Sequence, residues 1–307
     1  MNHPERPVAG PAGITVIGCG YTGRRLLKLC RDTGRECLGT VRSRESLARL
    51  EALGASAVQL DLDPPAGEFP DAWPRAWSAG RALIYMAPPP DSGESDPRIR
   101  NFVARLRQAP EALVYLSTTG VYGDTGGAGV DERTPPAPAS ARGKRRLDAE
   151  NALREWAAET GAALRILRVP GIYGPGRLPL ERIAAGAPVV AEEDAGPGNR
   201  IHVDDLAAVS LAAADYRGAL EVFNVGDGEH ASMGEYFRAV ARAAGLPSPP
   251  ELPLAELLQR VSPAMRSFLV ESRRVDTDRM RRELGFTPRY TELAAGVAAS
   301  LEAAQSD

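Results

Sequence analysis

Three glycines near the start of the chain, Gly18, Gly20 and Gly23, have the spacing G-x-G-x-x-G. They follow the apolar, β-branched run 15–17 and precede a helical pattern, which is the setting of a dinucleotide-binding turn. In such a turn the first glycine permits the bend, the second lets the backbone approach a pyrophosphate, and the third lets helix pack on strand. The alternative is a plain turn without a ligand. We therefore expect a nucleotide site lined by Gly18, Cys19, Gly20, Tyr21, Thr22 and Gly23.

A second chemical signal stands at the end of the next expected strand, 36–41, which runs into Arg42, Ser43 and Arg44. Dinucleotide sites that prefer NAD usually place an acidic residue here to bind the ribose 2′-hydroxyl, whereas an arginine accommodates a 2′-phosphate. These three positions carry two guanidiniums and a hydroxyl, so the sequence favours NADP as the cofactor, with NAD as the alternative. A solvated basic start of a helix would explain the same residues without a ligand.

Hydroxyl side chains follow a third expected strand. The apolar run 112–116 opens into Ser117, Thr118 and Thr119. If this strand lies in one sheet with the glycine turn, these hydroxyls stand at the ligand-binding edge and can hydrogen-bond a substrate. The alternative is a local turn in which the hydroxyls bond their own backbone.

The apolar runs that position these residues alternate with helical patterns over the first 170 residues. The run 82–87 is almost continuously apolar, as expected for a strand of a parallel sheet that is covered on both faces. This alternation predicts an α/β fold with a Rossmann-type, doubly wound parallel sheet whose ligands bind at the carboxyl ends of the strands. The expected strands are 15–17, 36–41, 57–62, 82–87, 112–116, 163–169 and 222–225.

Composition excludes several classes of function. The 307 residues carry a formal net charge of -3, which gives no basic footprint for nucleic acid. Apolar runs stay well short of the ~20 residues that a membrane span needs, and residues 1–13 lack a signal-peptide core, so we expect a cytoplasmic protein. Three cysteines without a C-x-x-C pair and three histidines indicate neither a disulfide framework nor a metal site.

Ordered motifs along nearly the whole chain resemble those of the extended short-chain dehydrogenase/reductases, the NAD(P)-dependent epimerase/dehydratase family. Each motif is weak alone, and their common order carries the resemblance. After the glycine loop they are Ser117-Thr118-x-x-Val121-Tyr122-Gly123, Lys144 with Glu150 downstream, Leu167-Arg168-x-x-x-Ile172-Tyr173-Gly174-Pro175-Gly176, Ile201-His202-Val203-Asp204-Asp205-Leu206, Phe223-Asn224-Val225-Gly226 and Leu284-Gly285-Phe286-x-Pro288.

The resemblance implies a catalytic set of Ser or Thr, Tyr and Lys. Thr118 matches the hydroxyl residue, and Lys144 matches the lysine that holds the nicotinamide ribose and lowers the pKa of the tyrosine. The tyrosine belongs four residues before the lysine, where this chain has Ser140. An aliphatic hydroxyl is far less acidic than a phenol of pKa ~10, so the chain is expected to be an atypical member that lacks the usual catalytic tyrosine.

Two other tyrosines follow strands near the expected site and offer a replacement phenol. They are Tyr122, which we expect to be the better candidate, and Tyr173; the alternative for each is a tyrosine that packs its loop. His202 has a suitable pKa for acid/base work, but its motif favours a hydrogen-bonded structural role. Four arginines are candidates for binding an anionic substrate, with solvated helix faces as the alternative: Arg177, Arg200, Arg266 and Arg273.

The resemblance also implies a domain plan. A flexible tail, 1–12, would precede an NAD(P)-binding domain, 13–170, to which 200–228 returns. A smaller, mostly helical substrate domain would comprise 171–199 and 229–307. Further cofactor contacts are expected at strand ends or from the motif lysine: Asp61, Ala87, Val169 and Lys144.

Two functions from different classes remain open on the sequence. The first is an NADP-preferring oxidoreductase or epimerase-like enzyme acting on a small polar molecule, possibly as a homodimer, which the resemblance suggests. The second is a catalytically silent NAD(P)-binding redox sensor or scaffold, which the exchange at Ser140 favours. A lyase or isomerase that uses its nicotinamide transiently is a third alternative.

Overall fold

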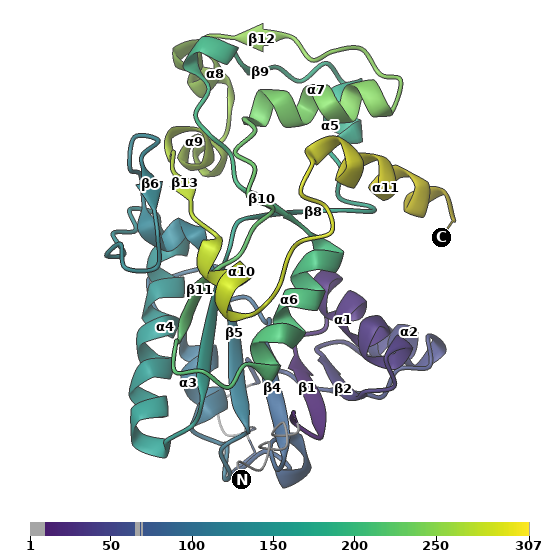
Figure 1. Cartoon of the computed structure of the whole chain (residues 1–307), viewed down its shortest axis with the longest axis vertical. Coiled ribbons are helices and arrows are strands. Elements are labelled where there is room, and N and C mark those ends of the chain that lie inside the picture. Colours follow the sequence, from purple (N-terminus) through teal and green to yellow (C-terminus); the bar gives the residue numbers. More distant parts are fainter. Residues whose placement is uncertain (1–9, 65–67, 69, 307) are drawn as a thin grey trace, which may run out of the picture.

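A computed structural model describes residues 10–64, 68 and 70–306. Its centre is a parallel sheet with the strand order β11-β7-β5-β4-β1-β2-β3, so the predicted α/β fold with a doubly wound sheet is confirmed (Figure 1). The strand order reverses between β1 and β4, and ligands of such sheets bind at that switch point. The strands are β1 (Gly13–Ile17), β2 (Glu36–Val41), β3 (Ala57–Gln59), β4 (Arg81–Tyr85), β5 (Ala112–Thr118), β7 (Leu164–Val169) and β11 (Val222–Asn224).

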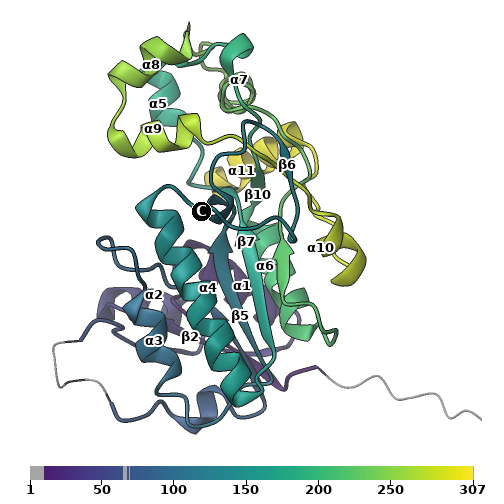
Figure 2. The same cartoon turned by 90° about the vertical axis from the view of Figure 1, so that its left-hand side faces the viewer.

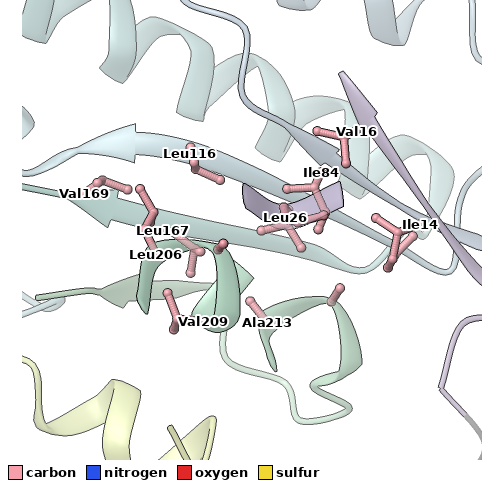
Figure 3. Close-up of a cluster of buried hydrophobic side chains, with 14 of the residues drawn as sticks. Ile14, Val16, Leu26, Ile84, Leu116, Leu167, Val169, Leu206, Val209 and Ala213 are labelled. Carbon is pink, nitrogen blue, oxygen red and sulfur yellow. The ribbon is translucent and has the colours of Figure 1, made fainter. Parts of the chain in front are cut away.

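Helices cover both faces of this sheet, because alternate side chains of each strand point to opposite faces. In β4, Ile84 packs with α1 and α6, whereas Leu83 packs with α3 and α4. Figure 3 shows the first of these layers, in which Leu167 lies near Leu206 of α6 and Ile84 lies near Leu26 of α1. The covering helices are α1 (Tyr21–Asp32), α2 (Arg44–Ala52), α3 (Pro97–Val103), α4 (Ala141–Thr160) and α6 (Val203–Asp215).

A second group of elements lies beyond the carboxyl ends of the strands (Figures 1 and 2). It has an apolar cluster of its own, which includes Tyr173, Phe237 and Val297. Its elements are α5 (Leu180–Ala184), β9 (Val189–Val190), η3 (Glu192–Asp194), α7 (Met233–Ala243), β12 (Glu251–Leu252), α8 (Leu254–Arg260), α9 (Pro263–Val270) and α11 (Leu293–Ser306). The helical patterns at 233–244, 254–261 and 293–303 predict α7, α8 and α11, whereas no pattern predicts α9.

Short elements connect the two groups. β8 pairs with β10, and β6 pairs with β13, so segments from distant parts of the chain lie side by side above the sheet. The chain then returns to the sheet through α6 and β11. The connecting elements are η2 (Thr119–Tyr122), β6 (Gly129–Val130), β8 (Gly171–Tyr173), β10 (Arg200–His202), β13 (Arg274–Val275) and α10 (Asp278–Glu283). One further turn, η1 (Arg75–Trp77), belongs to the sheet domain and lies between β3 and β4.

The expected flexible tail, 1–12, falls outside the described residues up to position 9. The remaining part contacts the fold: the Ala12 amide donates to the Gly80 carbonyl oxygen at 2.9 Å, and the Pro11 carbonyl oxygen accepts from Arg35. Residues 10–12 are therefore attached to the sheet domain.

Candidate functional site

The glycine loop joins β1 to α1 at the carboxyl edge of the sheet. Gly18 has a φ of +89°, and a Cβ there would lie 2.8 Å from the Ala87 backbone nitrogen. A Cβ on Gly23 would lie 3.3 Å from the Cys19 Cβ, against the start of the helix. At Gly20, by contrast, a Cβ would meet no described atom within 4 Å. The first and third glycines thus permit close packing within the protein, and the second faces open space.

That open space is a cleft of about 670 Å³ along the carboxyl ends of the strands. The cleft lies at the β1/β4 switch point, where a doubly wound sheet binds its ligand. The sequence-predicted residues that line it are Gly18, Cys19, Gly20, Tyr21, Thr22, Gly23, Arg42, Asp61, Ala87, Thr118 and Val169.

Two of the predicted cofactor residues that follow β2 lie outside this cleft. Ser43 caps α2, since its Oγ accepts a hydrogen bond from the Ser46 amide at 3.2 Å. Arg44 is the exposed first residue of the same helix. Ser46, one turn into α2, lines the cleft in their place. Of the three residues Arg42, Ser43 and Arg44, only Arg42 lines the cleft.

A second cavity, of about 430 Å³, opens between the sheet edge and the upper elements. Its walls come from the start of α4, from α7 and from the segments 194–200 and 271–273. The residues that line both this cavity and the cleft are Thr118, Pro170, Ile172, Arg142 and Arg177. A ligand in the cleft and a second ligand in this cavity would therefore meet at a common junction.

Thr118 stands at this junction at the end of β5. Its Oγ1 accepts a hydrogen bond from the Gly120 amide at 3.2 Å and so caps η2. The hydroxyl therefore makes the local turn that the sequence offers as an alternative, and it also lines both cavities. In this turn the hydroxyl acts only as an acceptor. Its proton can therefore still be donated to a ligand, in a direction set by rotation about Cβ–Oγ1.

The start of α4 corrects the predicted catalytic pair. The Lys144 ammonium is ion-paired with Glu94 at 2.6 Å, and Lys144 points to that exposed loop, not to the cleft. Ser140 caps α4, its Oγ accepting from the Gly143 amide at 3.3 Å, and lines only the second cavity. Successive residues of an α-helix are turned by about 100°, and this places Lys144 on the face of α4 that points away from the cleft. Lys144 is thus misassigned as a ribose ligand.

The cleft-facing residues of α4 are two arginines that the sequence analysis missed. Arg142 lines both cavities and Arg146 lines the cleft. Arg146 also donates to the Leu116 carbonyl oxygen at 2.9 Å and to the Tyr115 hydroxyl at 3.1 Å. The signal that could have found them is helical spacing, since positions 142 and 146 continue in steps of four to the fully buried Glu150.

Tyr122, the first candidate for a replacement phenol, lines neither of the two cavities. It is 2% exposed, and its hydroxyl donates to the Asn224 Oδ1 at 2.7 Å. The Arg168 guanidinium lies over its ring, 4.7 Å from the centroid, and the same guanidinium is paired with buried Glu150 at 2.8 Å. Burial raises the pKa of Tyr122. This tyrosine is part of an interior polar network behind the cleft.

Tyr173 and His202 are neighbours in the wall between the sheet and the upper elements. Tyr173 lines the second cavity, and its ring meets that of His202 edge to face at 5.3 Å. The Nδ1 of His202 accepts from the Asp204 amide and caps α6, and burial lowers its pKa. His202 therefore has the structural role expected of it.

Three of the four candidate arginines for an anionic substrate line the second cavity, and the exposed Arg266 does not. Arg200 donates to the carbonyl oxygens of Ala231 and Ser232. Arg273 donates to two backbone carbonyls of 119–123 and pairs with Glu271 at 2.6 Å. Arg177 lies over the ring of Tyr21, 4.0 Å from the centroid. Arg200 and Arg273 thus fasten segments together, while Arg177 stands at the junction.

Two kinds of feature are absent from the part of the chain that the structure describes. No group of three or more metal-ligating side chains is found among the described residues. In the same part of the chain, no helix combines the length and apolar character needed to cross a membrane.

Comparisons with known proteins agree with this architecture. Residues 100–226 match the model of the NAD dependent epimerase/dehydratase family. Protein YeeZ of Escherichia coli strain K12 is 26% identical over 242 residues, which cover 77% of this chain and 85% of that protein. A functionally unknown conserved protein from Silicibacter pomeroyi DSS has 31% identity and a TM-score of 0.76, with 97% of this chain and 99% of that chain covered.

A likeness in fold extends to enzymes of this family. The structure of UDP-glucuronic acid 4-epimerase from Bacillus cereus in complex with NAD has a TM-score of 0.72 at 16% identity. It covers 96% of this chain and 99% of that one. Taken with the sheet order and the glycine loop at its switch point, these matches show that the chain belongs to the NAD dependent epimerase/dehydratase family.

Proposed function

We propose that this chain binds a nicotinamide dinucleotide along the cleft. The observation that carries the proposal is the open space in front of Gly20, at the start of α1. The first turn of α1 consists of Tyr21, Thr22 and Gly23, so its amides have no acidic neighbour there to compete with a phosphate. A helix start of this kind favours an anion through both its N–H groups and its dipole. The Bacillus cereus epimerase contains NAD, which supports the same cofactor class here.

NADP is the cofactor that we propose in preference to NAD. Arg42 follows β2 directly, is exposed and lines the cleft. A guanidinium at this strand end suits a 2′-phosphate, because it can donate two parallel hydrogen bonds to it. Asp61 lines the cleft at the end of the next strand and would contact the adenosine half of the ligand.

The proposed activity is that of an oxidoreductase or epimerase-like enzyme acting on a small polar molecule in the second cavity. Bound nicotinamide would accept or donate a hydride. Thr118 would hydrogen-bond the substrate oxygen, since it lines the junction of the two cavities. A homodimer remains part of the proposal, and light scattering on the purified chain tests it.

A second candidate function rests on α4. We infer that Arg142 and Arg146, four residues apart on the cleft face, stand where the family's tyrosine and lysine belong. A guanidinium keeps its proton at any physiological pH, so it cannot pass one to a substrate as a phenol does. This observation favours a cofactor-binding sensor or scaffold without turnover.

Titration of the purified chain with NADPH and NADH, followed by nicotinamide fluorescence, tests the proposal. We expect saturable binding of both, tighter for NADPH. The Arg42→Ala variant should lose most of the preference for NADPH, and Arg44→Ala serves as its matched control because Arg44 lies outside the cleft. Binding of neither nucleotide would contradict the proposal, and equal losses in both variants would contradict the role of Arg42.

Oxidation of bound NADPH by a panel of small carbonyl compounds separates the two candidate functions. Turnover with any member supports the enzyme. Tight binding without hydride transfer to the whole panel supports the sensor or scaffold.

A further inference from the structure

The first turns of α4 concentrate positive charge at the wrong end of a helix. Four of its first six residues are basic: Arg142, Lys144, Arg145 and Arg146. Cations near a helix N-terminus oppose the helix dipole, and adjacent guanidiniums repel one another. A local arrangement that conflicts with such a rule commonly marks a functional site.

Two of these four cations are engaged by the loop that precedes α3. Lys144 pairs with Glu94, and the Arg145 side chain donates to the Gly93 carbonyl oxygen at 2.7 Å. Arg142 and Arg146 occupy the opposite face and line the cleft. Burial, and next the charge of Arg146, lower the pKa of Arg142. The cleft face of the helix therefore brings two like charges together.

Two carboxylates, Glu271 and Asp194, line the second cavity together with five arginines: Arg142, Arg177, Arg182, Arg200 and Arg273. Glu271 is ion-paired with Arg273 at 2.6 Å, and its charge also acts on Arg142. Asp194 accepts a hydrogen bond from the Leu254 amide at 2.9 Å. The walls thus keep an excess of positive charge around the junction.

A third guanidinium reaches the junction from a different element. Arg177, which follows β8, lines both cavities, as Arg142 does. Its face lies on the ring of Tyr21, and the N–H donors of a guanidinium lie in its plane, at right angles to such a contact. Stacking orients these donors without consuming them.

We propose that the junction of the two cavities binds an anionic group of the substrate, a carboxylate or a phosphate, through Arg142 with Arg177 as the second donor. The inference rests on the proposed function and deepens it, because it assigns the substrate to the class of small oxyacids. Guanidinium pairs recognise carboxylates and phosphates through parallel charge-assisted hydrogen bonds. The anion also offsets the repulsion between Arg142 and Arg146.

The anionic group that these arginines bind could instead be a phosphate of the cofactor, which would also lie in the cleft. A test must therefore be made with the cofactor site full. The chain is saturated with NADPH, and inorganic phosphate or malonate is then titrated at constant ionic strength, with thermal unfolding as the readout. Parent, Arg142→Gln, Arg177→Gln and Lys144→Gln are compared, the last being matched in charge and helix position but turned to Glu94.

We expect phosphate or malonate to raise the melting temperature of the NADPH-bound parent and of Lys144→Gln. The apparent dissociation constant should rise at least tenfold in Arg142→Gln and less in Arg177→Gln. Equal affinity in all four proteins would overturn the proposal. So would loss of the anion effect on saturation with NADPH, since that result would assign Arg142 to the cofactor.

Failure of this inference is distinguishable from failure of the proposed function. If the parent binds NADPH but neither anion, the cofactor site stands and the substrate class is wrong. If the parent binds no nucleotide, the proposed function is wrong. The anion titration is then carried out without nucleotide, and it still compares Arg142→Gln with Lys144→Gln. Retained NADPH binding by each variant shows that it is folded.

Discussion

Two glycines of one motif allow a test in which the same substitution has opposite consequences. Gly18→Ala would place a methyl group 2.8 Å from the Ala87 backbone nitrogen, at a φ of +89°. Gly20 has a φ of -79°, and a methyl group there would meet no described atom within 4 Å. We expect the first substitution to damage the fold and the second to damage only ligand binding.

The magnitudes follow from the backbone geometry. An alanine in the left-handed region costs roughly 1–2 kcal/mol, and overlap with fixed backbone adds about 1–3 kcal/mol. Gly18→Ala should therefore lower the free energy of unfolding by roughly 2–5 kcal/mol, which for a chain of 307 residues corresponds to a fall in melting temperature of about 3–8 °C. Gly20→Ala should change stability by less than about 0.5 kcal/mol and weaken NADPH binding at least about tenfold, or ~1.4 kcal/mol.

Thermal unfolding and NADPH titration on the same preparations provide the assay. Gly34→Ala is a control, because Gly34 has a φ of +69° but a Cβ there would meet no described atom within 4 Å. It should lose only the conformational part of the stability and bind NADPH like the parent. Parent-like affinity in Gly20→Ala would refute the placement of a pyrophosphate over this loop. A large fall in its melting temperature would refute the open space.

Three further predictions concern the side chains of Lys144, Tyr122 and Asp227. Lys144→Ala should leave NADPH affinity unchanged and cost at most about 1 kcal/mol of stability, because the Lys144–Glu94 pair is exposed. A large loss of NADPH affinity would show that Lys144 does contact the cofactor. Tyr122→Phe leaves the buried Asn224 amide oxygen without its donor and should cost about 1–3 kcal/mol in urea unfolding, with NADPH binding unchanged. Burial raises the pKa of Asp227 to about 7. Folding then takes up a proton, so stability should fall as pH rises from about 4 to 7, at up to ~1.4 kcal/mol per pH unit. Asp227→Asn should lack that slope between about pH 5 and pH 7, and a slope that persists in the variant would assign the linkage to another group.

The parts of the site that the sequence predicts well are those at strand ends. Arg42, Asp61, Ala87 and Thr118 all line the cleft. Each follows an apolar run, and in a parallel sheet all carboxyl ends lie on one edge, so recognising the strand is enough to place the residue. For such a residue, its position in the sequence is enough to predict its place in the fold.

Helical and turn positions are harder, because direction depends on phase. Lys144 and Arg146 are two residues apart, which turns one by about 200° relative to the other. If a motif is aligned to this helix two residues out of place, a residue predicted to face the cleft faces the loop before α3 instead. The predicted start of the helix is not affected by such a shift. Tyr122, which the sequence offers as a candidate, lies away from the cleft for a related reason: its sequence position is near the site, but the 3-10 turn η2 directs its ring into the interior.

The arginine pair also bears on where the proton of any reaction comes from. Hydride addition to a carbonyl generates an alkoxide, and hydride removal from an alcohol requires that the hydroxyl proton leave. Arg142 can stabilise the anionic oxygen, but a guanidinium does not exchange its proton near neutral pH. Thr118 is the hydroxyl at the junction, yet its oxygen accepts from the Gly120 amide, and no ionised base among the described residues bonds it. Within the described residues, the junction is thus built to bind negative charge better than to transfer protons, and proton transfer falls to solvent or to a group that the substrate carries.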